Sequence, residues 1–283
     1  MNETIYILLP VHNRRKVTRR FIGCLKEQTY RNYHLVLIDD GSTDGTAEMV
    51  REQIRSLTVV RGIGDWWWGG ALHEGYKWLC SRNPSPADIV LIINDDNEFE
   101  PDFLEKAASV LAGRPRTFLM SRCYSRQTGQ LLDAGIHVDW KRFTFEQASA
   151  DKPVNCLATR GLFFRVEDFS EVGGFRPWLL PHYLSDYEFT IRAGRKGMAL
   201  VTDPSVTLRL DESTTGHSTA GNGPVLRGVK NIFSRRSTIN PLTLSVFVAI
   251  ACPWRWKLQS WFRILSLSVT YAYRLLTGKA AIL

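Results

Sequence analysis

Residues 35–45 read LVLIDDGSTDG, four apolar side chains followed at once by two aspartates and a turn-forming segment. A short apolar run bounded by turn formers is typical of a strand that is buried on both faces. Asp44 is a candidate cap for a helix that would carry Ala47, Val50 and Ile54. The stretch therefore predicts a buried strand that opens into an acidic turn and then a helix.

The same arrangement recurs on both sides of this stretch. Apolar runs at residues 5–9, 57–60 and 89–93 predict three further strands, with segments of helical spacing among them and after Pro101. This alternation predicts an α/β fold in which helices flank a mostly parallel sheet. Ligands bind such sheets beyond the carboxyl ends of the strands. Both Asp39-Asp40 and the quartet Asn94-Asp95-Asp96-Asn97 are expected at that edge.

The charge of the chain is unevenly distributed. The net charge of the 283 residues is +8, but Ser213–Leu283 holds nine Lys and Arg and no Asp or Glu. The remainder then carries 27 bases and 28 acids, a net of −1, from 36 − 9 bases and 28 acids. Because the body is slightly acidic and lacks a nucleic-acid-binding motif, we expect no nucleic-acid partner.

The cysteines and the N-terminus indicate the compartment. The five cysteines are an odd number without a Cys-x-x-Cys pair, which favours a reducing environment. Residues 5–11 are too short for the apolar region of a signal peptide and contain Pro10. We therefore expect a cytoplasmic protein.

The acidic quartet at residues 94–97 has two explanations. Carboxylates and amides at a strand end are hard oxygen ligands suited to Mg²⁺ or Mn²⁺ beside a diphosphate. A solvated turn followed by a helix cap explains the same residues, and it explains Asp39-Asp40 as well. Their shared position at the ligand edge of the sheet favours the metal site.

Taken in order, these motifs resemble the family 2 glycosyltransferases of the GT-A fold, the fold of nucleotide-diphospho-sugar transferases. The resemblance covers roughly residues 4–215 and implies that fold for residues 1–222. The matching segments are Pro10-Val11-His12-Asn13, Gln28-Thr29-Tyr30, residues 39–46, residues 94–97, residues 161–165, Val172-Gly173-Gly174-Phe175 and residues 186–194.

The resemblance also implies a reaction. It is the transfer, with inversion, of a hexosyl or deoxyhexosyl group from a nucleotide-diphosphate sugar to a hydroxyl of a glycan or lipid-linked acceptor, in cell-surface polysaccharide synthesis. Asp186 would be the general base, and Asp96 and His217 would hold Mg²⁺ or Mn²⁺. The implied nucleotide-binding residues are Pro10, Asn13, Asp39, Asp40 and Asp95, of which Asp40 would accept a hydrogen bond from the base.

Three positions depart from the family pattern. His12 replaces the usual Tyr. Asn94 occupies the first acidic position of the D-x-D motif, as in the N-x-D variants of rhamnosyl- and galactofuranosyl-type members, and leaves Asp96 as the firm metal carboxylate. Ser185 replaces the Glu that ordinarily precedes the catalytic Asp, and Glu188 stands where a second Asp is usual. We place Glu188 with the acceptor residues.

Trp66, Trp67 and Trp68 follow one another directly, so they cannot all face one core. We expect at least one to line a cleft, where an indole face can stack on a sugar ring, and one or two to be core residues. Gly69-Gly70 would either allow a phosphate to approach the backbone or begin the next helix.

Residues 223–283 form a basic, aromatic tail. Leu242–Trp254 is apolar but shorter than the roughly 20 residues that a membrane-spanning helix needs. The following segment places Leu258, Phe262, Leu265 and Val269 at helical spacing among arginines, which favours a helix at the inner surface of the cell membrane. The alternative is a helix packed on the catalytic domain.

Two other functional classes share part of this pattern. A sugar nucleotidyltransferase has a similar nucleotide-binding sheet, but its N-terminal G-x-G-x-R loop is absent. A non-catalytic glycan-binding relative would be indicated by loss of Asp96 or Asp186, and both are present. No G-x-G-x-x-G follows the first strand, which disfavours a dinucleotide oxidoreductase.

Overall fold

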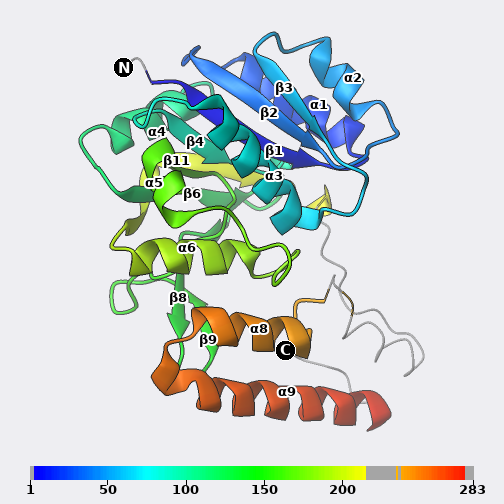
Figure 1. The fold of residues 1–283 in the computed structure, drawn as a ribbon, viewed down its shortest axis with the longest axis vertical. Helices are drawn as coiled ribbons and strands as arrows, with labels where there is room; N and C mark the ends of the chain where they lie inside the picture. The colour runs from blue at the N-terminus through cyan, green and yellow to red at the C-terminus, as the bar shows by residue number, and fades with distance from the viewer. Residues whose placement is uncertain (1–2, 215–233, 235–236, 278–283) are drawn as a thin grey trace.

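The computed structural model describes residues 3–214, 234 and 237–277, and one nine-stranded sheet organises them (Figure 1). Its strand order is β3-β2-β1-β4-β10-β6-β11-β5, with β7 paired to β6. These strands are β1 (Ile5–Val11), β2 (Tyr33–Asp39), β3 (Leu57–Arg61), β4 (Ile89–Ile92), β5 (Asn97–Glu98), β6 (Thr117–Ser125), β7 (Leu131–Asp133), β10 (Leu162–Arg165) and β11 (Ala199–Leu210). A separate hairpin comprises β8 (Ile136–Asp139) and β9 (Thr144–Gln147).

The four predicted strands are confirmed as β1 to β4, and they pair in parallel. The second half of the sheet is mixed, because β10 runs antiparallel to both β4 and β6, whereas β6 and β11 are parallel. The predicted α/β class is therefore confirmed.

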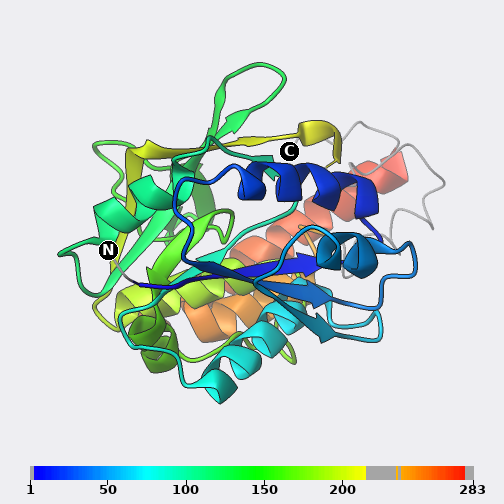
Figure 2. The same ribbon diagram turned by 90° about the horizontal axis from the view of Figure 1, so that it is seen from above.

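Helices cover both faces of the sheet (Figure 2). They are α1 (Arg15–Lys26), α2 (Thr46–Arg51), α3 (Trp67–Arg82), α4 (Phe103–Leu111), α5 (Val166–Val172) and α6 (Ser185–Arg195). Because side chains alternate along a strand, Ile7 and Leu9 of β1 join the core beneath α1, α2 and α4, whereas Leu8 joins the core beneath α3, α5 and α6. Burial on both faces explains why β1, β2 and β4 contain continuous apolar runs, whereas β3 at the sheet edge is half-buried.

Polar side chains connect α1 to α4 and to the start of α2. The Gln28 side chain accepts a hydrogen bond from the Leu104 amide at 3.0 Å and donates one to the Glu100 carbonyl at 2.9 Å. It therefore joins the end of α1 to the start of α4. Asp44, the predicted helix cap, lies one residue before the observed N-cap of α2, and its carboxylate accepts from the amides of Thr46 and Arg15.

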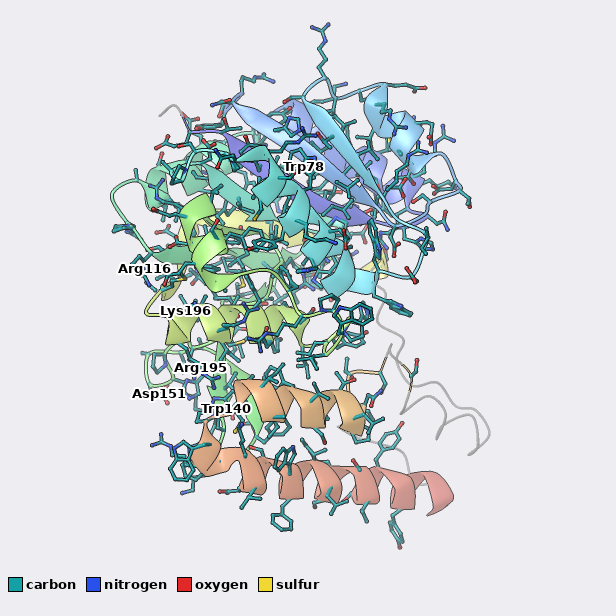
Figure 3. All side chains as sticks on the ribbon, viewed as in Figure 1. Trp78, Arg116, Trp140, Asp151, Arg195 and Lys196 are labelled. Atoms are coloured by element: carbon teal, nitrogen blue, oxygen red, sulfur yellow. The ribbon has the colours of Figure 1, made fainter. Side chains whose placement is uncertain are left out.

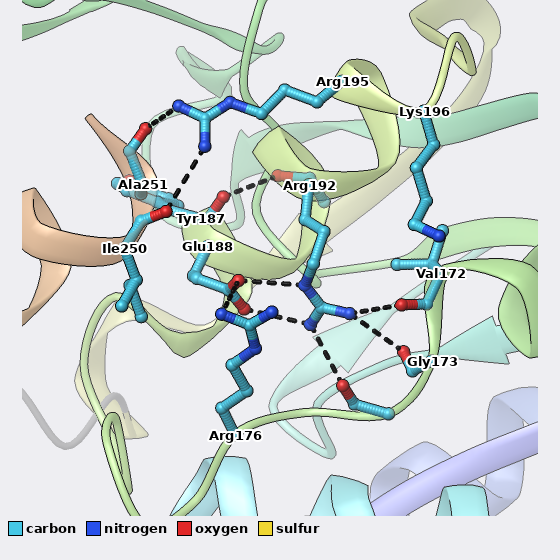
Figure 4. Close-up of polar contacts among 12 residues, drawn as sticks. Val172, Gly173, Arg176, Tyr187, Glu188, Arg192, Arg195, Lys196, Ile250 and Ala251 are labelled. Atoms are coloured by element: carbon cyan, nitrogen blue, oxygen red, sulfur yellow. Dashed lines mark hydrogen bonds and ion pairs between the residues drawn. The ribbon is translucent and has the colours of Figure 1, made fainter. Parts of the chain in front are cut away.

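The C-terminal segment adds α8 (Pro241–Ala251) and α9 (Lys257–Thr277). Phe247 and Val248 of α8 pack into a third core with Ile191 of α6 and the β8–β9 hairpin. Arg195, near the end of α6, donates to the carbonyls of Ile250 and Ala251 (Figure 4). In Figures 1 and 3, α9 lies beyond α8, on the side away from the sheet. The predicted boundary at residues 222–223 falls outside the described residues.

Candidate active site

Two cavities lie at the carboxyl ends of β1, β2 and β4. The smaller, which we call the β1–α3 cavity, has a volume of about 270 Å³, and the larger, which we call the α6 cavity, about 450 Å³. The β1–α3 cavity is lined by Pro10, Val11, His12, Arg14, Asp40, Trp67, Ala71 and Asp95, and the α6 cavity by Asp133, Ala158, Thr159, Arg160, Tyr183, Leu184, Asp186, Tyr187 and Thr238. Both cavities are lined by Trp68, Asn94, Asp96 and His182, so they meet at the acidic quartet.

Asp40 holds the tryptophan segment in place. Its carboxylate accepts hydrogen bonds from the backbone amides of Gly64 at 2.8 Å, Trp66 at 2.9 Å and Trp67 at 3.3 Å. These amides precede or open α3, so the carboxylate stabilises the start of that helix.

Two other predicted nucleotide-binding residues shape the neighbouring turn instead of lining either cavity. Asp39 accepts from the Ser42 amide at 2.9 Å. Asn13 has a left-handed backbone, with φ of 53°, and its side chain accepts from the Thr43 amide at 2.8 Å. Both residues therefore position the loops at the ends of β1 and β2.

The three tryptophans have different surroundings. Trp66 packs against the core beneath α3, Trp67 lines the β1–α3 cavity, and Trp68 both packs against that core and lines the two cavities. The Trp68 indole donates to the Thr159 hydroxyl at 3.2 Å, and the ring centroid of Trp67 lies 5.5 Å from that of His182. The indoles thus form part of the wall between the two cavities.

Gly69 and Gly70 lie inside α3, which begins at Trp67. The Gly69 amide donates to the Pro181 carbonyl at 2.8 Å, and a Cβ on Gly69 would lie 2.6 Å from the Leu180 carbonyl oxygen. The close backbone approach at Gly69 is therefore to the loop before α6.

The adjacent carboxylates of Asp95 and Asp96 have different surroundings. Asp95 accepts from the Arg14 Nε and the Thr18 hydroxyl, both at 2.7 Å. Asp96 Oδ1 is buried without a hydrogen-bond donor among the described residues, and its Oδ2 lies 3.6 Å from Arg14 Nη2. Burial raises the pKa of both carboxyls. A buried acceptor oxygen without a donor, at a cavity wall, fits a cation ligand.

Asp96 would have few protein partners in holding a metal. Within residues 3–214, 234 and 237–277, no group of three or more His, Cys, Asp and Glu could hold a metal ion. His217, the other predicted ligand, lies outside those ranges. Mg²⁺ commonly takes one or two carboxylates and completes its shell with water and substrate phosphates, so the donor set fits a cation shared with a diphosphate.

Asp186 lies in the first turn of α6 and lines the α6 cavity. Its Oδ1 accepts from the Tyr187 amide at 2.9 Å. Burial raises the pKa of Asp186 to about 6. Ser185, which replaces the usual Glu, is buried and donates to the His182 carbonyl at 2.7 Å, so it connects α6 to the preceding loop.

Glu188 lies away from both cavities. Its side chain is 3% exposed and pairs with Arg192 at 2.9 Å and Arg176 at 3.5 Å (Figure 4). Arg192 also donates to the carbonyls of Val172, at 2.5 Å, and Gly174, at 3.0 Å. The structure thus places Glu188 in the network that holds the Gly-Gly-Phe loop against α6.

Several cavity residues were not found from the sequence. Asp133, Arg160 and the adjacent pair His182-Tyr183 come from three separate places in the chain. Each is a single polar or aromatic residue without a local repeat. The one available signal was that Arg160 directly precedes the Gly161 motif.

The comparison with known families agrees with this geometry. The profile of the family described as "Glycosyl transferase family 2" matches residues 6–173, more than half of the chain. This chain is a family 2 glycosyltransferase. The family assignment made from the motifs is therefore confirmed.

Relatives of this glycosyltransferase differ in how much they share with it. It is 24% identical over 230 residues to the N-acetylglucosaminyl-diphospho-decaprenol L-rhamnosyltransferase of Mycobacterium tuberculosis, covering 72% of this chain and 75% of the relative. It is 30% identical over 104 residues to the uncharacterized protein MJ1222 of Methanocaldococcus jannaschii, covering 37% of this chain and 40% of that protein.

A solved structure confirms the GT-A fold of this glycosyltransferase. The mannosyltransferase PcManGT from Pyrobaculum calidifontis, in complex with GDP-Man and Mn²⁺, aligns with a TM-score of 0.56 at 19% identity. The alignment covers 97% of this chain and 79% of that one.

Replacing Asp40 tests its role in holding the tryptophan segment. We expect Asp40→Ala to lower the free energy of unfolding by about 2–3 kcal/mol, because it leaves three backbone amides without their charged acceptor. Asp65→Ala is the matched control, since Asp65 is exposed in the same loop. Equal urea-unfolding midpoints for the two variants would show that the carboxylate does not hold this loop.

Proposed function

We propose that this glycosyltransferase moves a hexosyl or deoxyhexosyl group, with inversion, from a nucleotide-diphosphate sugar to a hydroxyl of a glycan or lipid-linked acceptor. The reaction would serve cell-surface polysaccharide synthesis. The observation that carries the proposal is the position of Asp96, whose unsatisfied oxygen lies where the two cavities meet. The rhamnosyltransferase relative, whose name specifies a lipid diphosphate, supports the acceptor class.

The β1–α3 cavity is the proposed nucleotide site. Pro10, Asp40 and Asp95 line it, and Asn13 and Asp39 shape the adjoining turn. Asp40 Oδ1 accepts one hydrogen bond, from Gly64, and a carboxylate oxygen can accept two. It can therefore still accept a hydrogen bond from an N–H of the nucleotide base.

The proposed metal site is at Asp96, with His217 as the second candidate ligand. Mg²⁺ or Mn²⁺ bound there would act as a Lewis acid on the diphosphate and stabilise its negative charge as it leaves. Because Asp95 is already satisfied by Arg14 and Thr18, we assign it the role of supporting Asp96 and the start of α1. The Mn²⁺ complex of the mannosyltransferase supports a divalent cation.

The α6 cavity is the proposed acceptor site. The acceptor oxygen attacks the anomeric carbon, and its proton passes to the Asp186 carboxylate. The bond between the anomeric carbon and the diphosphate oxygen breaks, and the nucleoside diphosphate leaves with that electron pair. Trp67 and Trp68 offer indole faces for the sugar rings. Attack from the side opposite the leaving group inverts the anomeric centre.

Removing the Asp96 carboxylate tests the metal assignment. In calorimetry of the full chain with UDP, GDP and dTDP, we expect Mn²⁺ to strengthen binding of the preferred nucleotide. In Asp96→Ala this metal-dependent gain should fall by at least about tenfold, as loss of metal-site residues does elsewhere. Asp151→Ala, which removes an exposed carboxylate, is the control. An unchanged gain in Asp96→Ala would remove Asp96 from the metal site.

Asp186 is tested by rate and by pH together. Its carboxyl has a raised pKa of about 6, and only the ionised form accepts a proton, so kcat/KM should rise with pH through about 6 and level off above it. Asp186→Asn should lower transfer by about 10²–10⁴-fold and abolish this rise, with donor affinity nearly unchanged. A wild-type rate or an unchanged pH profile, with chemistry rate-limiting, would mean that another group is the base.

The outer face of α9 supports a membrane surface as partner. Leu258, Phe262, Leu265 and Val269 are each 60–71% exposed and lie on one stripe of the helix, whereas Ile264 on the other side is buried. Arg255 and Arg263 are exposed in the same segment, and residues 241–277 contain no Asp or Glu. An apolar stripe bordered by cations is typical of helices that bind anionic lipid surfaces.

The other tail helix faces the catalytic domain. α8 packs on α6, so the tail combines a helix bound to the domain with a helix open on its outer side. No helix among the described residues is both long enough and apolar enough to span a bilayer. On this proposal the protein is cytoplasmic and peripheral on the inner face of the cell membrane, and α9 brings the α6 cavity near a lipid-linked acceptor.

Vesicle binding tests this surface. The full chain should co-sediment with phosphatidylglycerol vesicles at low salt and bind phosphatidylcholine vesicles less well. Phe262→Ser combined with Leu265→Ser should weaken binding at least about tenfold, since each large apolar side chain contributes about 1.5–3 kcal/mol on burial. Ile63→Ser, which removes an exposed apolar side chain of the β3–α3 loop, should have no effect. Failure to bind anionic vesicles, or dimerisation through the stripe, would overturn the assignment.

A further inference from the structure

Arg160 is a charged side chain in the α6 cavity whose donors are largely unused. It is half-buried, two residues before β10 begins, and it lines the cavity with Asp96, Asp133 and Asp186. Its Nε is buried without a hydrogen-bond partner among the described residues. Its Nη1 lies 3.9 Å from Cys123 Sγ, a weak acceptor.

Arg14, the other arginine among the residues that line the two cavities, differs in this respect, because its Nε donates to Asp95. No ion pair among the described residues includes Arg160. Burying a guanidinium without partners is unfavourable, so a fold retains one most readily where a ligand supplies the missing acceptors.

The charge of Arg160 is maintained by its surroundings. Burial acts to lower the pKa of the guanidinium, but Cys123, Asp96 and Asp133 act to raise it, and the net direction is upward. The residue therefore presents a cation beside three carboxylates of the same cavity. An anion entering there meets Arg160 and whatever cation Asp96 holds.

We propose that Arg160 binds a diphosphate group where the two cavities meet. This inference rests on the proposed function and deepens it by naming the group that this residue recognises. A planar guanidinium presents parallel N–H donors that match two phosphate oxygens, and charge-assisted bonds of this kind are strong. Asn94, in place of a carboxylate, leaves Asp96 with a weaker hold on a cation, so a fixed positive charge compensates at the leaving group.

Two diphosphates fit this chemistry. One is the diphosphate of the donor, which enters from the β1–α3 cavity, and the other is that of a lipid-linked acceptor, which enters the α6 cavity. Both would reach Arg160 near Asp96, one of the residues that line both cavities. The two sources can be distinguished by asking for which of two probes an Arg160 variant loses affinity.

The test is calorimetry on the full chain with Mg²⁺, using two probes. The first probe is the nucleoside diphosphate that the wild type binds best among UDP, GDP and dTDP, and the second is farnesyl diphosphate. Arg160→Met should weaken binding of at least one probe by about 10–100-fold, because it removes a charge-assisted contact. Affinity for the corresponding nucleoside, which lacks phosphate, should not change, and this separates a phosphate contact from a structural defect.

Two further variants sharpen the result. Arg160→Lys keeps the positive charge but lacks the planar guanidinium, so its affinity for the probe should lie between those of Arg160→Met and the wild type. If Arg160→Met does not fold, the test uses Arg160→Lys instead. Asp133→Asn removes a half-buried negative charge from the same cavity and should strengthen binding of the same probe. Opposite effects at Arg160 and Asp133 are expected only if the anion lies in their cavity.

Each outcome has one interpretation. If Arg160→Met loses affinity for the nucleoside diphosphate, Arg160 binds the diphosphate of the donor. If it loses affinity for farnesyl diphosphate, Arg160 binds the diphosphate of the lipid-linked acceptor. Wild-type affinity of Arg160→Met for both probes overturns the role of Arg160 and leaves the proposed function intact. If the wild type binds neither probe, the proposed function and this inference fail together.

Discussion

The parallel pairing of β1 with β2 on one side and β4 on the other is the constraint on which the site depends. Seven consecutive residues of β1 pair with β2, and Ile5–Leu8 pair with Ile89–Ile92. With this register, β2 ends at Asp39 and β4 ends just before the acidic quartet, so both acidic segments lie at the same edge of the sheet. The carboxylates are then concentrated at one edge because the apolar strands beneath them cannot shift without exposing their core.

Concentrating carboxylates at a buried edge has an electrostatic cost, and the fold compensates some of them with its own donors. Asp40 is satisfied by three backbone amides, Asp95 by Arg14 and Thr18, and Glu188 by Arg192. Asp96 retains an oxygen without a donor. Asp186 lies in a cavity where burial raises its pKa. The compensated carboxylates hold loops and helix starts, whereas in the proposed function Asp96, Asp186 and the remaining acceptor position of Asp40 Oδ1 bind ligands.

Helix α6 connects the site to the C-terminal segment. Asp186 lies in its first turn and Arg195 in its last, where the guanidinium binds the carbonyls that end α8. Tyr187, one residue after Asp186, packs against the core that α8 completes. α8 therefore packs on the helix that carries Asp186, which gives this part of the tail a structural role as well as a proposed membrane role.

The sequence by itself determined the four parallel strands, the helices between them and the position of both acidic segments at one edge. It could do so because a strand buried on both faces appears in the sequence as a continuous apolar run, and a turn appears as a cluster of glycine and aspartate residues. Each feature is therefore visible within a few neighbouring residues. Only the tertiary structure decided which carboxylates stay available. Asp95 accepts hydrogen bonds from donors 77 and 81 residues away in the sequence. Arg160 lines the same cavity as Asp96 and Asp186 only because β10, the end of β4 and α6 converge there. The local sequence pattern indicates which residues are buried and where the chain turns, whereas the partner of a charged side chain depends on contacts between distant segments.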